Sequence, residues 1–390
     1  MEYNKILESI TPSKSVTLLS KAKAMREADP AIINLTGGDP DFATPQAICD
    51  EAAKWMKAGY THYVDGQGEK ELRERIAAKL LEENDAPYQA DQIVITPGGK
   101  YAIYLAVRAL LNAGDEAIWL TPGWVSYPSI VQAAGGVPKA VDLHFADDFA
   151  LHREALEAVT TPRTKLLLIN SPNNPTGKVM SAADMQVLRD YMNAHPQIYL
   201  LSDEMYEKII YDGHVCISPA SFPELFERVI VVNGFSKSSA MTGWRIGYLA
   251  CNRELVRVIM KLAQHTLSCV SGFLQKGAIK ALDLPEETER MRQAYERRRD
   301  RIADGMRSIP GVTFHSPDGA FYAWVRFDVK EDSETLCNAL LEEAKIAGVP
   351  GGAYGPEDGT YIRFSFAASD ADLKEALKRL KSFMKAYRSG

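Results

Sequence analysis

The 390-residue sequence has little cysteine and no pattern that would pair it. Its five cysteines, Cys49, Cys216, Cys251, Cys269 and Cys337, are odd in number and dispersed, and none forms a Cys-x-x-Cys pair. This argues against a disulfide framework or a zinc site and favours free thiols in a reducing compartment. The first residues, MEYNKILESI, also lack the pattern of a signal peptide. We therefore expect a cytoplasmic protein without a bound metal.

Long apolar runs and long basic stretches are absent too. No apolar segment reaches the length of a membrane-spanning helix. The formal net charge is −6, and the basic run ERRRD at 296–300 is typical of a solvated helix face. We therefore expect neither a membrane nor a nucleic acid among the partners.

What the sequence does contain is a regular alternation of two kinds of segment. Between about residue 90 and residue 250, short runs rich in Val, Ile, Leu and Tyr alternate with longer segments, such as 100–114, whose apolar residues recur at helical spacing. This alternation predicts an α/β fold in which helices cover a mostly parallel sheet. The expected strands are DQIVIT (91–96), DEAIWL (115–120), TKLLLIN (164–170), IYLLSDE (198–204), RVIVVNG (228–234) and GYLACN (247–252).

The C-terminal part of the chain predicts a second, smaller α+β unit. A charged helix at 285–309 precedes a strand at 319–328, a helix at 333–349, a strand at 361–367 and a last helix at 370–387. The N-terminal segment is too short for a domain of its own, and we expect it to join the smaller unit. The predicted division is therefore an N-terminal segment at 1–44, a large domain at 45–284 and a small C-terminal domain at 285–390.

One lysine has an unusual setting, the segment NGFSKSSAMTGWRIG at 233–247. An amine attacks carbonyl groups only when it is unprotonated, and desolvation or cationic neighbours lower its pKa enough for that. Lys237 follows a predicted buried strand, and the nearby Ser236 and Arg245 suit a phosphate. The segment fits a lysine that forms an imine with a phosphorylated aldehyde, although taken alone it more often marks a surface lysine in a turn.

Three further motifs also follow predicted strands. The glycines of TPGGKYAI (96–103) open a helix, where backbone N–H groups can bind an anion. The turn SPNNPTGK (171–178) fixes the direction of Asn174. The segment LLSDEMYEKI (200–209) places Asp203 at a strand end, with Tyr206 three residues later. Each motif alone is also explained as an ordinary turn or helix cap.

Together the four motifs define a candidate site. In an open α/β sheet, ligands bind at the carboxyl edge of the strands, where all four motifs are predicted to meet. The set supplies a lysine, a buried acid, an asparagine, a tyrosine, a glycine-rich anion site and a serine–arginine pair. Pyridoxal 5′-phosphate needs an imine-forming amine, an acid for its pyridine nitrogen and a phosphate cup. We therefore predict that the site binds this cofactor.

On these motifs, the sequence resembles the class I and II aminotransferases of pyridoxal-phosphate fold type I. It is most similar to the bacterial branch that contains aspartate and prephenate aminotransferases, over nearly the whole chain. The resemblance implies a large domain with a mostly parallel mixed sheet flanked by helices, and a smaller α+β domain. The segments that carry it are TGGDPDFATP (36–45), THYVDGQGEKELR (61–73), TPGGKYA (96–102), TPGWVSYP (121–128), NSPNNPTGK (170–178), SDEMYE (202–207), NGFSKSSAMTGWRIG (233–247), GAFYAWV (319–325) and YIRFSFAAS (361–369).

The resemblance implies roles for the residues of the cofactor site. Lys237 would carry the cofactor and, as general base and acid, move a proton between the substrate Cα and the cofactor. Asp203 would pair with the pyridine nitrogen, while Asn174 and Tyr206 would hydrogen-bond the ring oxygen O3′. Lys237, Asp203 and Tyr206 are thus the expected catalytic residues, and Trp124 would stack on the ring. The residues implied around the phosphate are Gly98, Gly99, Lys100, Ser236 and Arg245, together with Tyr63 from the neighbouring subunit.

The resemblance also implies a shared active site and a substrate site. A Tyr63 that serves the neighbouring subunit would make the protein an obligate homodimer. Arg363 would bind the substrate α-carboxylate through its planar guanidinium, and an arginine in an otherwise apolar strand needs such a partner. A loop near Ser15 would close over the substrate. The residues implied to contact the substrate are Gly38, Trp124, Asn174 and Arg363.

The expected activity is transfer of an amino group from an L-amino acid to a 2-oxo acid by a ping-pong mechanism. Aspartate with 2-oxoglutarate is the first choice, because Lys100 could serve a second carboxylate. Aromatic, prephenate and broad neutral amino-acid preferences stay open, since HTLSCVSGFLQ (265–275) departs from the family's usual Ser/Thr-rich loop with a proline. A β-lyase on the same fold also stays open. A ligand-binding regulator is disfavoured, because the match begins near residue 1 and leaves no room for a DNA-binding module.

Overall fold

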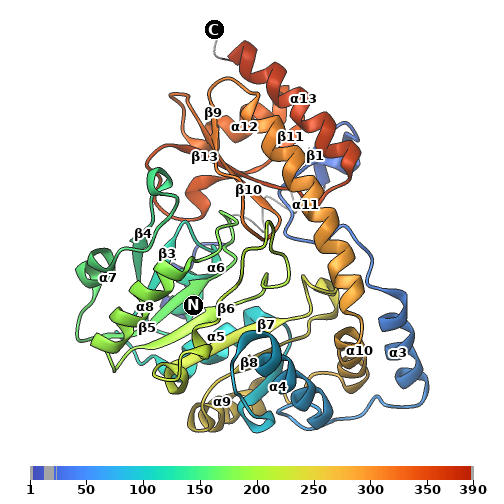
Figure 1. Ribbon diagram of the computed structural model, residues 1–390, viewed down its shortest axis with the longest axis vertical. Coiled ribbons are helices and arrows are strands. Elements are labelled where there is room, and N and C mark those ends of the chain that lie inside the picture. Colours follow the sequence, from blue (N-terminus) through green and yellow to red (C-terminus); the bar gives the residue numbers. More distant parts are fainter. Residues whose placement is uncertain (1–2, 13–21, 23, 388–390) are drawn as a thin grey trace.

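The computed structural model describes residues 3–12, 22 and 24–387. Its largest element is a seven-stranded sheet between two layers of helices (Figure 1). The strand order is β2 (Ile93–Thr96), β8 (Gly247–Ala250), β7 (Val229–Gly234), β6 (Tyr199–Asp203), β5 (Thr164–Asn170), β3 (Glu116–Thr121) and β4 (Val137–Asp142). All neighbouring pairs are parallel except the two that involve β8. The predicted α/β fold with a mostly parallel mixed sheet is confirmed.

The central strands are apolar throughout because side chains on both of their faces are buried. Leu167 and Val231 pack into one layer, whereas their neighbours Leu168 and Val232 pack into the other. The first layer contains α4 (Lys70–Asn84), α8 (Ala182–Ala194) and α10 (Gly272–Leu282), and the second contains α5 (Gly99–Leu110), α6 (Ser126–Ala133) and α9 (Arg253–Thr266). Two more helices extend these layers: α3 (Gln46–Lys57) contacts α10, and α7 (Arg153–Val159) contacts α8 and β4.

A second unit is built around a four-stranded antiparallel sheet, at the top of Figure 1. Its strand order is β12 (Val349–Pro350), β13 (Thr360–Ser365), β10 (Tyr322–Phe327) and β9 (Val312–Phe314). Its core is shared with α11 (Pro285–Arg307), α12 (Ser333–Glu343) and α13 (Asp370–Tyr387). Near the N-terminus, a short helix α1 (Lys5–Ser9) precedes β1 (Ile33–Asn34), which pairs in parallel with β11 (Ile346–Ala347) beside this unit.

The prediction misses β4 and the short strands β1, β9, β11 and β12, and it extends one helix too far. The strand β4 is missing from the prediction because it is an edge strand with mostly exposed or half-buried residues, and so lacks an apolar run. The helix predicted at 333–349 ends at Glu343, because Lys345 takes a positive φ of 57° and the next two residues pair with β1. The domain boundaries proposed at residues 44 and 284 stay predictions.

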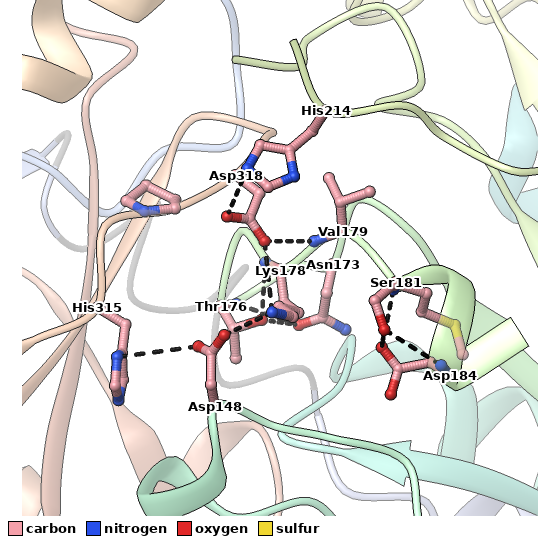
Figure 2. Close-up of polar contacts among 12 residues, drawn as sticks. Asp148, Asn173, Thr176, Lys178, Val179, Ser181, Asp184, His214, His315 and Asp318 are labelled. Atoms are coloured by element: carbon pink, nitrogen blue, oxygen red, sulfur yellow. Dashed lines mark hydrogen bonds and ion pairs between the residues drawn. The ribbon is translucent and has the colours of Figure 1, made fainter. Parts of the chain in front are cut away.

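The two sheets are joined by a polar network around Lys178, which follows β5 (Figure 2). The Lys178 Nζ lies 2.5 Å from Asp148 Oδ2 and 3.6 Å from Asp318 Oδ2. His214 lies 3.4 Å from Asp318, and His315 lies 3.8 Å from Asp148. Because Asp318 and His315 stand just before β10, this network ties the start of β10 to the turn that carries Asn174.

Candidate active site

A cavity of about 370 Å³ lies at the carboxyl edge of the seven-stranded sheet, where β10 and β13 approach it. This is the edge at which ligands bind in open α/β sheets. Gly98 lies just outside the lining, next to Gly99. The predicted site residues that line the cavity are Gly38, Gly99, Lys100, Trp124, Asn174, Asp203, Tyr206, Ser236, Lys237, Arg245 and Arg363. Segments far apart in the sequence therefore meet as predicted.

Lys237 follows β7 and extends its amine into the cavity. Its Nζ donates a hydrogen bond to the carbonyl oxygen of Gly38, at 2.5 Å. Desolvation lowers the pKa of Lys237 to about 8; Arg245 and Arg363 act in the same direction, and Asp39 opposes it. A usable fraction of the amine is therefore neutral near physiological pH, which nucleophilic attack on a carbonyl requires.

Asp203 ends β6 at the base of the cavity and is buried. Its Oδ2 accepts a hydrogen bond from the Tyr127 hydroxyl at 2.8 Å, and its Oδ1 accepts one from the Met205 backbone N–H at 3.2 Å. Burial raises the pKa of the Asp203 carboxyl to about 6, against the effect of these two donors. A cation placed opposite this carboxylate would favour its charged form, so the position suits a protonated ring nitrogen.

The start of α5 forms a positively charged end of the cavity. Gly98 has a φ of +84°, and a Cβ at this position would lie 2.6 Å from Arg245 Nη2, so only glycine permits this close approach. The Arg245 guanidinium donates to the Thr242 carbonyl, Ser236 is buried beside the cavity, and Lys100 Nζ lies 5.0 Å from the Trp124 ring centroid. A helix N-terminus with two nearby cations is suited to a phosphate group.

Arg363 on β13 forms a second cationic end. Its guanidinium donates to Asn174 Oδ1 at 2.9 Å and to the Thr36 carbonyl at 2.6 Å, and it lies over the rings of Tyr322 and Tyr354. The side chain is buried, yet no carboxylate pairs with it in the part of the chain that the structure describes. Because a buried charge needs a counter-charge, this end of the cavity suits an anionic ligand group.

Several site residues were not singled out in the sequence. Asn170 accepts a hydrogen bond from the Asn174 backbone N–H at 2.8 Å and donates to the Asp203 carbonyl at 2.9 Å, so it fixes two predicted residues. It ends a predicted strand, which was an available signal. Tyr127 and Tyr322 lie in motifs of the resemblance, but their partners come from distant segments that a single sequence does not reveal.

Three other predictions have different outcomes. Tyr63 is 87% exposed and does not line the cavity of its own chain, so its predicted role needs a second subunit and stays a prediction. Ser15 lies outside the described residues. The segment 265–275 connects α9 to α10 and is absent from the described lining of the cavity.

Within residues 3–12, 22 and 24–387, no group of three His, Cys, Asp or Glu side chains could hold a metal ion. None of the helices in these ranges is both long and apolar enough to cross a membrane. All five cysteines are free.

Comparison with known proteins decides the family. Residues 30–380 match the model of the family described as aminotransferase class I and II. The chain is an aminotransferase of this family. The resemblance found in the sequence is thereby confirmed, and the family consists of enzymes that depend on pyridoxal phosphate.

Full-length relatives of this aminotransferase are named for aspartate or for aspartate and prephenate. It is 40% identical to the aspartate aminotransferase of Geobacillus stearothermophilus, over 99% of this chain and 100% of that protein. It is 39% identical to the probable aspartate/prephenate aminotransferase of Aquifex aeolicus, over 95% of this chain and 96% of that protein. The crystal structure of the Rhizobium meliloti aspartate aminotransferase matches it with a TM-score of 0.94 and 36% identity, over 99% of each chain.

Proposed function

We propose that this aminotransferase exchanges the amino group of aspartate with 2-oxoglutarate, with pyridoxal 5′-phosphate held at Lys237. The proposal is carried by the arrangement of one cavity, which Lys237 lines together with two cationic ends. One end is the buried Arg363, and the other is formed by Lys100 and Arg245 at the start of α5. Names of the full-length relatives support the choice of aspartate.

The residues present fit the cofactor. Asp203 is a buried acid for the ring nitrogen, and Tyr206 has a hydroxyl for the ring oxygen. Ser236, Arg245 and the backbone N–H of Gly99 would hold the phosphate. The bound cofactor supplies an electron-withdrawing ring that makes the substrate Cα–H acidic. Lys237 Nζ, with its pKa lowered by desolvation, would accept the proton from the substrate Cα as general base and donate it to the cofactor as general acid.

The same cavity explains how a substrate would be oriented. Arg363, supported by Asn174 and the Thr36 carbonyl, would bind the α-carboxylate and hold it away from solvent. Lys100 would bind the second carboxylate of a dicarboxylic substrate. Burial lowers the pKa of Lys100, and Arg245 lowers it further, so an anion near these two cations relieves their repulsion.

An aromatic or prephenate preference is the second candidate. Trp124, Tyr322 and Tyr354 give the cavity aromatic walls, and the Aquifex aeolicus relative is named for both aspartate and prephenate. Such a preference would use these walls in place of Lys100. It stays open beside the aspartate proposal.

A donor panel tests the proposed function. Aspartate added alone to the holoenzyme should bleach its visible absorbance band, and with 2-oxoglutarate as acceptor aspartate should give the highest kcat/KM. Lys100→Met should lower kcat/KM for aspartate at least tenfold more than for alanine, because only aspartate has the second carboxylate. A ranking of aspartate below phenylalanine or alanine would overturn the substrate assignment, and no bleaching with any amino acid would overturn the reaction.

A further inference from the structure

Tyr322 contacts both the proposed ring-oxygen donor and the proposed carboxylate arginine. Its hydroxyl oxygen lies 2.8 Å from that of Tyr206, and the centroid of its ring lies 4.3 Å from the Arg363 guanidinium carbon. The strand register explains this position: Tyr322 on β10 pairs with Ser365 on β13, so Arg363, two residues away, lies diagonally on the same face. Tyr322 is 1% exposed, and it lines the cavity.

A third group of the site is also built around this hydroxyl. A Cβ on Gly38 would lie 2.7 Å from the Tyr322 hydroxyl oxygen, which is too close for a carbon atom. The absence of a side chain at Gly38 therefore lets its backbone approach the phenol. The carbonyl of Gly38 in turn accepts the hydrogen bond from Lys237. The Tyr322 hydroxyl therefore lies where the parts of the site that hold the cofactor and the carboxylate meet.

We infer that Tyr322 is a positioning residue that couples the two halves of the site: its ring fixes the plane of Arg363, and its hydroxyl orients the hydroxyl of Tyr206. This inference rests on the proposed function only in taking the cofactor's ring oxygen as the acceptor for Tyr206. It adds a residue to which the sequence pattern gave no role.

The number of protons decides the direction of the hydrogen bond. Each hydroxyl carries one proton, and burial raises the pKa of both Tyr206 and Tyr322, so both stay protonated. When the Tyr206 hydroxyl donates its hydrogen bond to the ring oxygen of a ligand, Tyr322 must be the donor in the hydrogen bond between the two phenols. A hydroxyl that accepts a hydrogen bond becomes a stronger donor, so Tyr322 strengthens the contact that Tyr206 makes with the ligand.

Two substitutions separate the two contacts of Tyr322. Tyr322→Phe removes the hydroxyl but keeps the ring against Arg363, whereas Tyr322→Leu removes both. A hydrogen bond to the ring oxygen favours the deprotonated form of the bound cofactor, so its loss raises the pH midpoint of the visible absorbance change. We expect Tyr322→Phe to raise this midpoint by roughly half a unit, with KM for the amino donor within about twofold. Tyr322→Leu should also raise the midpoint. In addition, it should raise KM for the amino donor about tenfold, because Arg363 loses the ring it packs against.

A double-mutant cycle shows whether Tyr322 acts through Tyr206. In a Tyr206→Phe background, the change Tyr322→Phe should shift the midpoint no further, whereas a general structural effect would add to it. Tyr295→Phe is the matched control, because it removes a buried tyrosine hydroxyl close to Tyr322. The ring centroid of Tyr295 lies 5.2 Å from that of Phe321, and the Phe321 ring also contacts that of Tyr322. We expect this substitution to leave the contacts of Tyr206 unchanged. This control should leave the midpoint unchanged.

The outcomes separate this inference from the proposed function. A wild-type protein without a pH-dependent visible band would overturn the proposed cofactor attachment. If the wild type shows the band, two results would overturn the role of Tyr322. One is a Tyr322→Phe midpoint equal to that of the wild type, and the other is shifts that add in the double mutant. Should Tyr322→Phe not fold, the midpoint of Tyr322→Leu serves instead, because this variant also lacks the hydroxyl and should raise the midpoint in the same direction.

Discussion

At the scale of single residues, the site depends on groups whose ionisation is changed by their surroundings. Desolvation lowers the pKa of the Lys237 amine to about 8, while burial raises the pKa of the Asp203 carboxyl to about 6. Groups shifted in this way cluster at functional sites. The sequence was sufficient to predict both residues because each stands in a short motif after a strand. It was insufficient for Tyr322 and Tyr127, whose roles arise from contacts made only in the folded chain.

The shifted pKa of Lys237 predicts the pH dependence of cofactor attachment. Only the neutral amine attacks the cofactor aldehyde, so the attachment rate of the apo-protein should fall about tenfold per pH unit well below pH 8 and level off above it. The measurement is the rise of visible absorbance after cofactor is mixed with apo-protein between pH 6 and 10. A rate that keeps rising to pH 10 would show a lysine with an ordinary pKa. Lys237→Ala should show no such rise at any pH.

At the scale of elements, the buried strands were the most predictable feature. The central strands are apolar on both faces and could be placed from composition alone, whereas the half-exposed edge strand β4 could not. The short pairing between β1 and β11 depends on residues more than three hundred positions apart, so it left no local pattern. The turns that end strands were expected to meet at one edge of the sheet, and residues from all four motifs line one cavity there.

The turn at 171–178 gives a prediction about stability. Lys178 lies between Asp148 and Asp318; burial alone would lower its pKa, but the two carboxylates raise it above the ordinary value. Lys178→Met should lower the free energy of unfolding by about 1–2 kcal/mol, because it leaves two neighbouring carboxylates without their cation. Denaturant unfolding provides the measurement, with Lys374→Met on the exposed face of α13 as the control. Equal free energies of unfolding for the two variants would show that the network around Lys178 does not stabilise the fold.

At the scale of the whole molecule, the exposed Tyr63 bears on the proposed dimer. Its side chain is 87% exposed in a single chain, although the family resemblance gives it a phosphate contact in the neighbouring subunit. We propose a homodimer in which each cavity receives Tyr63 from the other chain, with each chain divided at about residues 44 and 284 as predicted. A single sequence cannot show a contact between two chains, and this part of the site stays a proposal.

Mixed dimers test this arrangement. A Lys237→Ala chain keeps a normal Tyr63, and a Tyr63→Ala chain keeps a normal Lys237, so a dimer with one of each has one complete site. Random reassembly of the two inactive or weakly active variants should restore roughly a quarter of wild-type activity. Activity no higher than the average of the two separate variants would contradict a shared site.

The account as a whole depends on Lys237 as the residue that holds the cofactor. The most direct test is to reduce the holoenzyme with borohydride, digest it and locate the added mass by mass spectrometry. The account predicts that the cofactor is found on the peptide containing Lys237 and that Lys237→Ala carries none. Cofactor attached to Lys100 or to another lysine, or no covalent attachment at all, would contradict it.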